Sequence, residues 1–200
     1  MVKIRKDMFS LEGNLIESLL DQENIRLSDT TIPSLDIPEH FNTITFSIDS
    51  ADNSRKKLKE ILYPIKELID SEEEFPTNLY TGVYEAVLNA YQHGNKYENK
   101  NIRLSYKKTK SKDKSLSLEI IVEDQGKTLP KGFLRYILLQ REQKNNQEHF
   151  LNWYDFSKKE PIGSNNGTGT SFMHASFDNI DYFRSREFGG LLVYLSKSVK

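Results

Sequence analysis

The amino-acid sequence predicts an α+β protein, a two-layer sandwich in which helices cover one face of a mixed, mainly antiparallel sheet. From residue 41 onward the expected order of elements is strand, helix, helix, strand, strand, helix, strand, strand. Alternating apolar residues mark the strands, and glycine, proline or polar segments separate the elements. The chain has 200 residues, 36% hydrophobic and 28% charged, which is enough for one sizeable buried core.

The first forty residues differ from the rest and are expected to form an N-terminal extension to a domain that spans residues 41–200. Residues 8–25 carry leucines at irregular helical spacing and predict a short amphipathic helix. Residues 31–40 contain two prolines and are expected to form an extended linker.

The domain is expected to begin with a strand at residues 41–48, where apolar and polar side chains alternate. Ser50 or Asp52 can then cap a helix that continues to about residue 69. A second helix is expected to open near Pro76 and to stop at Gly94.

The second half of the domain is expected to supply the remaining strands. These lie at residues 102–106, 116–123, 180–184 and 191–195. The lysine-rich residues 107–115 are interpreted as a solvated hairpin connection, residues 131–166 as a lid or insertion, and residues 170–177 as a short helix.

Charge and composition exclude several functional classes. With 28 basic and 29 acidic residues the net charge is −1, which gives no general attraction to nucleic acid or to an anionic membrane. The absence of cysteine excludes disulfides, thiol chemistry and cysteine zinc sites. No apolar run reaches the roughly 20 residues that cross a bilayer, and no signal-like start is seen, so the expected location is the cytoplasm.

The second helix carries the clearest polar signal. Glu85 and Asn89 lie four residues apart, so with Thr81 they form one polar stripe along the helix. Apolar residues flank this stripe on both sides, which favours a helix that is buried on two sides and a stripe that lines a cleft. The alternative is an outward-facing polar side of an ordinary amphipathic helix.

A carboxylate follows the strand at residues 116–123. Asp124 continues the apolar row of alternate residues, and Gly126 allows close approach just beyond it. A buried carboxylate needs hydrogen-bond donors, which the exocyclic amine of adenine can supply. The alternative is a loop aspartate that caps a turn.

The third signal is the small-residue segment 163–171, which precedes a short helix. Gly167 and Gly169 alternate there with Thr168 and Thr170, and such residues let backbone amides face an anion at a helix N-terminus. The G-x-x-x-x-G-K-[ST] phosphate loop is absent, which excludes that class of nucleotide enzymes.

Taken together and in this order, the three segments resemble the N box, the D-x-G box and the glycine box of GHKL ATPases. Residues 189–197 are similar to the closing strand of that family, and the likeness covers about residues 41–197. The sequence motif E-A-V-x-N-A followed by H-G is most similar to that of the anti-sigma-factor serine kinases. Two positions depart from the family pattern, because Thr128 stands where a second glycine is usual and Leu191 where a threonine is frequent.

The resemblance implies that the chain binds ATP with Mg²⁺ and gives each box a role. Glu85 would be the base that takes a proton from the attacking hydroxyl, and Asn89 would bind magnesium. Asp124 would read the adenine amine, with Gly126 giving the base room. The remaining implied site residues are His93 after the N box and, around the phosphates, Gly167, Thr168, Gly169 and Thr170. Arg135 and Arg141 in the lid segment are candidates to reach the terminal phosphate.

The implied function is a serine/threonine protein kinase that phosphorylates an antagonist protein and sequesters a transcription factor such as a sigma factor. A homodimer is also implied by the resemblance. The alternative is a non-catalytic module in which ATP orders a surface that binds a protein partner. Glu85 favours catalysis, because a module that only binds has no need of a base there.

Overall fold

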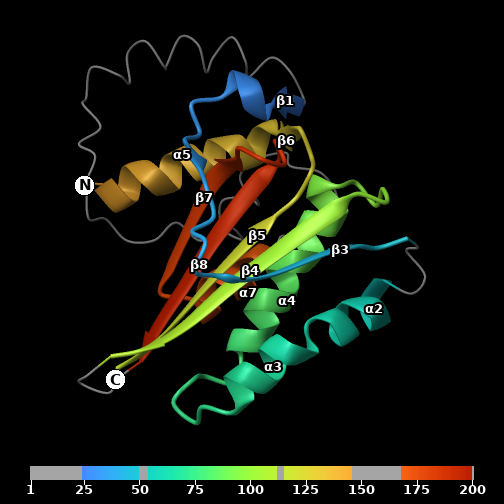
Figure 1. Ribbon diagram of the computed structural model, residues 1–200. Coiled ribbons are helices and arrows are strands. Elements are labelled where there is room, and N and C mark those ends of the chain that lie inside the picture. Colours follow the sequence, from blue (N-terminus) through green and yellow to red (C-terminus); the bar gives the residue numbers. More distant parts are fainter. Residues whose placement is uncertain (1–23, 50–53, 112–114, 146–167, 200) are drawn as a thin grey trace.

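The computed structural model describes residues 24–49, 54–111, 115–145 and 168–199 (Figure 1). Its main sheet has six strands in the order β2-β7-β8-β5-β4-β3. β2 pairs with β7 in parallel, and every other neighbouring pair is antiparallel. The predicted fold class, an α+β sandwich built on a mixed and mainly antiparallel sheet, is therefore confirmed.

Five strands of this sheet match the expected segments closely, and the sixth, β2, lies in the segment expected to be an extended linker. Their bounds are β2 Ser34–Leu35, β3 Asn42–Ser47, β4 Asn101–Lys110, β5 Leu116–Glu123, β7 Asn179–Ser185 and β8 Leu191–Val199. The helices are α2 Ser54–Ile61, α3 Tyr63–Asp70, α4 Leu79–Asn89, α5 Lys131–Asn145 and α7 Thr168–Ser176. β4 continues to Lys110, so it includes the first part of the lysine-rich connection expected at residues 107–115.

The helix expected to run to about residue 69 is wrong as a single element, because it is divided into α2 and α3. Pro64 lies in the first turn of α3. Proline lacks the N–H group that a helix interior needs but fits a first turn, so it ends one helix and begins the next. The expected caps Ser50 and Asp52 lie outside the described residues.

The second expected helix extends to Gly94, as predicted, but changes geometry on the way. α4 is followed by a π-helical turn, η2, at Ala90–Gly94. Beyond it, Lys96 and Tyr97 adopt left-handed backbone angles, with φ of 54° and 60°. Single π-helical turns are frequent at functional sites, because they move the following side chains out of the regular helical register.

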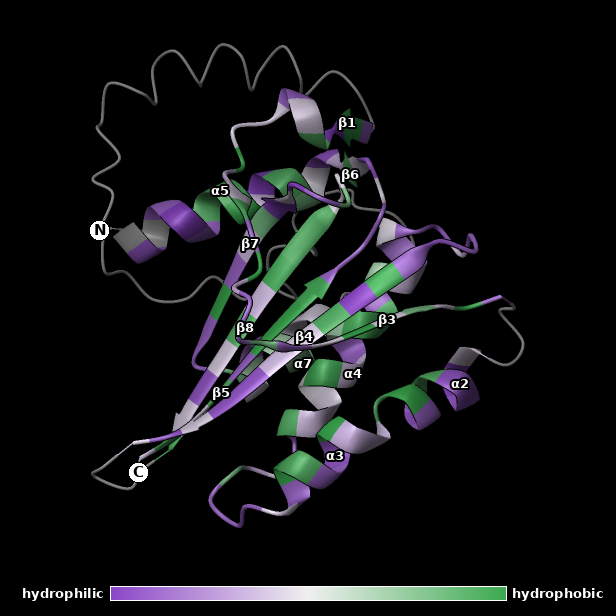
Figure 2. Cartoon of the chain, in the orientation of Figure 1, coloured by the Kyte–Doolittle hydropathy of each residue, from purple (hydrophilic) through white to green (hydrophobic). Residues whose placement is uncertain are grey.

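The hydrophobic core lies between the sheet and the helices. Leu104, Val122 and Val193 stand opposite one another on β4, β5 and β8 and are all buried. Figure 2 shows apolar residues along the central strands and along the inner sides of α3 and α4. Alternation along the strands therefore directs one row of each strand into the helix layer.

The chain before β3 contributes more structure than the sequence predicted. β1 (Asn24–Arg26) pairs antiparallel with β6 (Thr128–Pro130), and a 3-10 turn, η1 (Leu27–Asp29), follows it. The helix expected over residues 8–25 is therefore wrong at its end, because the fully buried Ile25 pairs with Leu129 in a strand. The earlier part of that expected helix lies outside the described residues.

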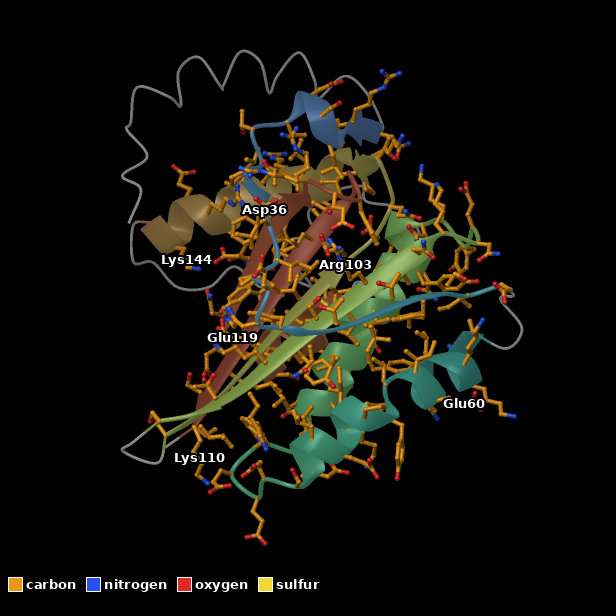
Figure 3. The ribbon with its side chains drawn as sticks, viewed as in Figure 1. Asp36, Glu60, Arg103, Lys110, Glu119 and Lys144 are labelled. Carbon is orange, nitrogen blue, oxygen red and sulfur yellow. The ribbon has the colours of Figure 1, made fainter. Side chains whose placement is uncertain are left out.

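Residues 36–41, named here the crossing segment, connect β2 at one edge of the sheet to β3 at the other. They pass over the sheet face that the helices leave open (Figure 1). A cavity of about 240 Å³ lies under the crossing segment, and Arg103 and Glu123 line it. Figure 3 shows Arg103 on this face, with Asp36 from the crossing segment near it. This face is covered enough to bury Glu123, which is 1% exposed.

Candidate functional site

The site is built on close packing between α4 and α7. At Gly82 a Cβ would lie 2.8 Å from the Cβ of Ser176 and 2.9 Å from the ring of Phe177. The Ser176 hydroxyl donates to the carbonyl of Asn78 at 3.1 Å, which ties the C-terminal end of α7 to the start of α4. The two helices run antiparallel, so the N-terminal end of α7 meets the C-terminal half of α4.

The polar stripe of α4 faces this N-terminal end of α7. A Cβ at Gly169 would collide with Oε2 of Glu85 and would lie 3.7 Å from Oδ1 of Asn89. Asn89 Nδ2 donates to the sulfur of Met173 at 3.4 Å, which leaves the Oδ1 oxygen directed toward Gly169. Residues predicted from two separate motifs, the polar stripe and the glycine segment, are thus brought together, and Gly169 lets the helices approach without displacing the Glu85 side chain.

The glycine box begins a helix earlier than expected. α7 starts at Thr168, so Gly169 and the buried Thr170 lie in its first turn. The N–H groups of a first turn have no partner within the helix, and the helix dipole gives that end a partial positive charge. This turn therefore has donors that can face an anion. Gly167 lies outside the described residues.

Glu85 is half-buried, and burial raises the pKa of its carboxyl group. The nearby Arg55 guanidinium, at the start of α2, lowers that pKa but is the smaller effect. A carboxylate with a raised pKa is a better proton acceptor near neutral pH. The sequence analysis missed Arg55, because only the folded chain brings α2 next to α4.

Asp124 is the most strongly perturbed carboxyl group of the site. It is 3% exposed, and its Oδ1 accepts hydrogen bonds from the backbone N–H groups of Gly126 at 2.8 Å and Leu191 at 3.2 Å. Burial raises the pKa of Asp124 to about 7, although these two hydrogen bonds act in the opposite direction. Both bonds engage Oδ1, so Oδ2 is the oxygen without a bond to a donor of the described residues.

Two glycines pack against Asp124, and a third packs against one of them. A Cβ at Gly94 would collide with its carboxylate, and a Cβ at Gly190 would collide with its carbonyl oxygen and lie 2.5 Å from Oδ1. A Cβ at Gly126 would collide with the carbonyl of Gly94. The missing side chain of Gly126 therefore leaves room for the backbone of Gly94, whereas the sequence analysis expected that room to serve the adenine.

Asn95 fixes the turn that carries Asp124. Its side chain is fully buried, and its Oδ1 accepts the backbone N–H of Gln125 at 2.9 Å. Its Nδ2 donates to the carbonyls of Lys100 at 3.2 Å and Asn101 at 3.1 Å. One amide thus joins the end of η2, the start of β4 and the residue after Asp124. The sequence analysis missed it, because an asparagine after His-Gly has no distinguishing pattern.

The sequence analysis also singled out His93, Thr128 and Arg141. His93 lies at the surface at the end of η2, and partial burial lowers its pKa. Thr128, which stands where a second glycine is usual, pairs with Arg26 in the small sheet. Arg141 donates to the carbonyl of Tyr182 on β7, so it is not directed to the first turn of α7.

The site therefore has two ends on one helix. Glu85 and Asn89 stand at the first turn of α7, and Gly94, five residues beyond Asn89, contacts Asp124. At 1.5 Å per residue, the nine residues from Glu85 to Gly94 span roughly 13 Å. The donor set fits an ATP–magnesium complex, because an amide oxygen and first-turn N–H groups lie at one end and a buried carboxylate at the other.

The described residues contain neither a cluster of metal-binding side chains nor a helix that could span a membrane. No group of three or more His, Cys, Asp or Glu side chains is arranged there to hold a metal ion. No helix within the described ranges combines the length and apolar character needed to cross a bilayer.

The chain matches no protein-family model, and no curated protein is significantly similar to it in sequence.

Proposed function

We propose that this chain is an ATP-binding regulatory serine/threonine protein kinase of the anti-sigma-factor type, which transfers the γ-phosphate of ATP to an antagonist protein. The observation that carries the proposal is the contact of Glu85 and Asn89 with the first turn of α7, on the same helix whose far end touches Asp124. The resemblance of the three sequence segments to the boxes of GHKL ATPases supports it independently.

Each contact has a role in such a reaction. Asp124, as a carboxylate, accepts the adenine amine, and the first-turn amides of α7 bind the phosphates. Asn89 Oδ1 is a ligand for magnesium, which when bound supplies charge neutralisation at the phosphates. Glu85 accepts the proton of the substrate hydroxyl as its oxygen bonds to the γ-phosphorus and ADP leaves.

A protein substrate is supported by the surface beside this site. Phe172 on α7, three residues after Gly169, is 54% exposed. Aromatic side chains are enriched at protein–protein interfaces relative to the rest of the surface. The proposed partner is the antagonist protein, with a sigma factor as the protein that the switch holds or releases.

The test is the variant Glu85→Gln, which keeps the shape of the side chain but cannot accept a proton at neutral pH. General-base contributions are typically about 100- to 10,000-fold, so phosphate transfer should fall by that factor while ATP affinity stays within about twofold. Radiolabelled γ-phosphate transfer to the partner measures the rate, with ADP release as the readout in the absence of partner. The control is Glu60→Gln, the same chemical change at an exposed position on α2 (Figure 3), which should leave the rate unchanged.

An active wild type with an equally active Glu85→Gln variant would show that Glu85 is not the base. A wild type that binds Mg²⁺-ATP but transfers no phosphate to its partner would replace the kinase by the alternative, an ATP-dependent binding module.

A further inference from the structure

A cavity of about 380 Å³ lies between α5, α7 and β7. Its volume is within the range of small-molecule sites. α7 separates it from α4, because Met173 contacts Asn89 while the neighbouring His174 contacts α5. The cavity is therefore distinct from the nucleotide site, and the proposal below does not depend on the kinase assignment.

One wall of the cavity is a buried hydrogen-bond network. Tyr136 of α5 and Tyr182 of β7 both contact His174 Nε2 through their hydroxyl groups, at 2.9 and 3.2 Å. Gln140 Nε2 donates to the Tyr136 hydroxyl at 2.9 Å. Burial lowers the pKa of His174 to about 3, so this wall is uncharged at neutral pH. The network joins α5, α7 and β7 and holds this wall of the cavity in place.

The acidic side chains that line the cavity already have cationic partners. Asp181 pairs with Lys144 at 2.6 Å, and Asp178 pairs with Lys197 at 2.5 Å. Figure 3 shows Lys144 near the C-terminal end of α5. After these two ion pairs, the remaining charged side chain of the lining is Arg141.

Arg141 is a half-buried cation that forms no salt bridge with a carboxylate of the described residues, and Asp181, which pairs with Lys144, acts on it only at longer range. Its Nη2 donates to the carbonyl of Tyr182, and its guanidinium lies 5.6 Å from the ring centre of Phe183. Burial lowers its pKa, which means that the charge is poorly solvated. A guanidinium has five N–H donors, and the structure gives it one acceptor, so donors remain for a ligand in the cavity that Arg141 lines.

We propose that this cavity binds a small monocarboxylate with an apolar body, whose carboxylate pairs with Arg141. Ile137, Phe177 and Ile180 line the cavity and supply contacts for the body. Arg141 is the lining cation without a salt bridge to a described carboxylate, so it matches one further negative charge. A dianion such as a phosphate would meet the carboxylates of Asp178 and Asp181 in the same lining.

The experiment titrates the full chain with three probes, benzoate, phenylacetate and 4-methylpentanoate, by ligand-observed NMR. Each carboxylate is paired with its primary amide, which has the same shape without the charge, and phenylphosphonate serves as a dianion. We expect at least one carboxylate to bind with a Kd of about 10 mM or tighter and its amide to bind at least about tenfold more weakly, the loss of one charge-assisted hydrogen bond.

Two variants locate the binding. Arg141→Gln should weaken carboxylate binding at least about tenfold, and Lys131→Gln, in the first turn of the same helix and outside the lining, should leave it unchanged. Ile180→Trp fills the cavity and should abolish binding of carboxylate and amide alike. Equal affinity for carboxylate and amide, tighter binding of phenylphosphonate, or no binding of any carboxylate would overturn the proposal. The comparison of carboxylate with amide uses wild-type protein, so it holds even if a variant does not fold.

Discussion

The carboxylate of Asp124 lies directly against the Cα atom of Gly94, with no room for a Cβ between them. Asp124 directly follows β5 and Gly94 ends η2, so this contact joins the sheet layer to the helix layer at the candidate site. The contact makes the site sensitive to a change of one methyl group.

Gly94→Ala should therefore destabilise the fold and displace Asp124. Inserting a methyl group into a closely packed site typically costs about 1–3 kcal/mol, and ATP affinity should fall at least about tenfold. Gly189→Ala is the matched control, because Gly189 has φ of +73° and no neighbour within 4 Å. It should cost about 1 kcal/mol through backbone strain alone and leave ATP affinity unchanged. Thermal unfolding and calorimetry measure the two effects, and equal ATP affinities in both variants would contradict the prediction.

Asp124→Asn should make stability less dependent on pH. The pKa of Asp124 is raised to about 7 in the folded protein, from 3.8 in the unfolded chain. Between pH 4 and 7 the folded state therefore holds a proton that the unfolded state has lost, so wild-type stability falls as pH rises through this window. Above pH 7 the buried carboxylate of wild type is ionised, which lowers its free energy of unfolding by up to about 4 kcal/mol. The variant has no carboxylate there and does not lose this stability.

Denaturant unfolding of both proteins at pH 4 and pH 8 measures this difference. We expect the free energy of unfolding of the variant to rise relative to that of wild type as pH rises. At pH 8, Mg²⁺-ATP should stabilise only the wild type. A constant difference between the two proteins across the pH range would show that Asp124 does not titrate in this window.

The ion pair between Arg103 and Glu123 should contribute far more than the one between Arg103 and Glu187. The Glu123 side chain is 1% exposed, whereas the Glu187 side chain is 68% exposed. Removing one member of a buried pair leaves the other charge with less compensation, so Glu123→Ala should cost about 3 kcal/mol or more. Glu187→Ala should cost at most about 1 kcal/mol. Urea unfolding of the two variants compares them, and similar losses would refute the assignment.

Asn95→Ala should reduce both stability and ATP affinity, because it removes the amide that holds the turn after Asp124. Leaving buried backbone groups without partners costs about 1–3 kcal/mol. Asn101→Ala, which removes an exposed side chain and keeps the backbone carbonyl that Asn95 contacts, should change stability by less than about 0.5 kcal/mol. If Asn95→Ala lowers stability but not ATP affinity in calorimetry, Asn95 supports the fold without positioning Asp124.

The strands and the second helix could be predicted because their signals are local. Leu116–Glu123 alternates apart from Ile121, and Gly94 stops its helix within the same stretch of sequence. The division of α2 from α3 was also readable in principle, since Pro64 is a local signal. By contrast β1 and β2 are only three and two residues long, and each exists because a distant strand supplies its hydrogen bonds.

The candidate site was predictable residue by residue but not in its geometry. Glu85, Asn89 and Asp124 stand out through spacing and parity. The collisions that require glycine at positions 94 and 190, and the contact of Gly169 with Glu85, involve residues far apart in the chain, and no sequence pattern contains them. The same holds for Arg55, whose effect on Glu85 depends on how α2 packs against α4.

The crossing segment has a consequence for how the chain folds during synthesis. β2 and β3 follow one another in sequence yet form opposite edges of the sheet, and β2 pairs only with β7, which is made near the end. β2 and β3 are therefore synthesised before the strands with which they pair, so their edges stay unpaired during that part of translation. Native contacts of such long sequence separation slow folding and expose unpaired strand edges. We expect this domain to depend on chaperones during translation more than its size alone requires.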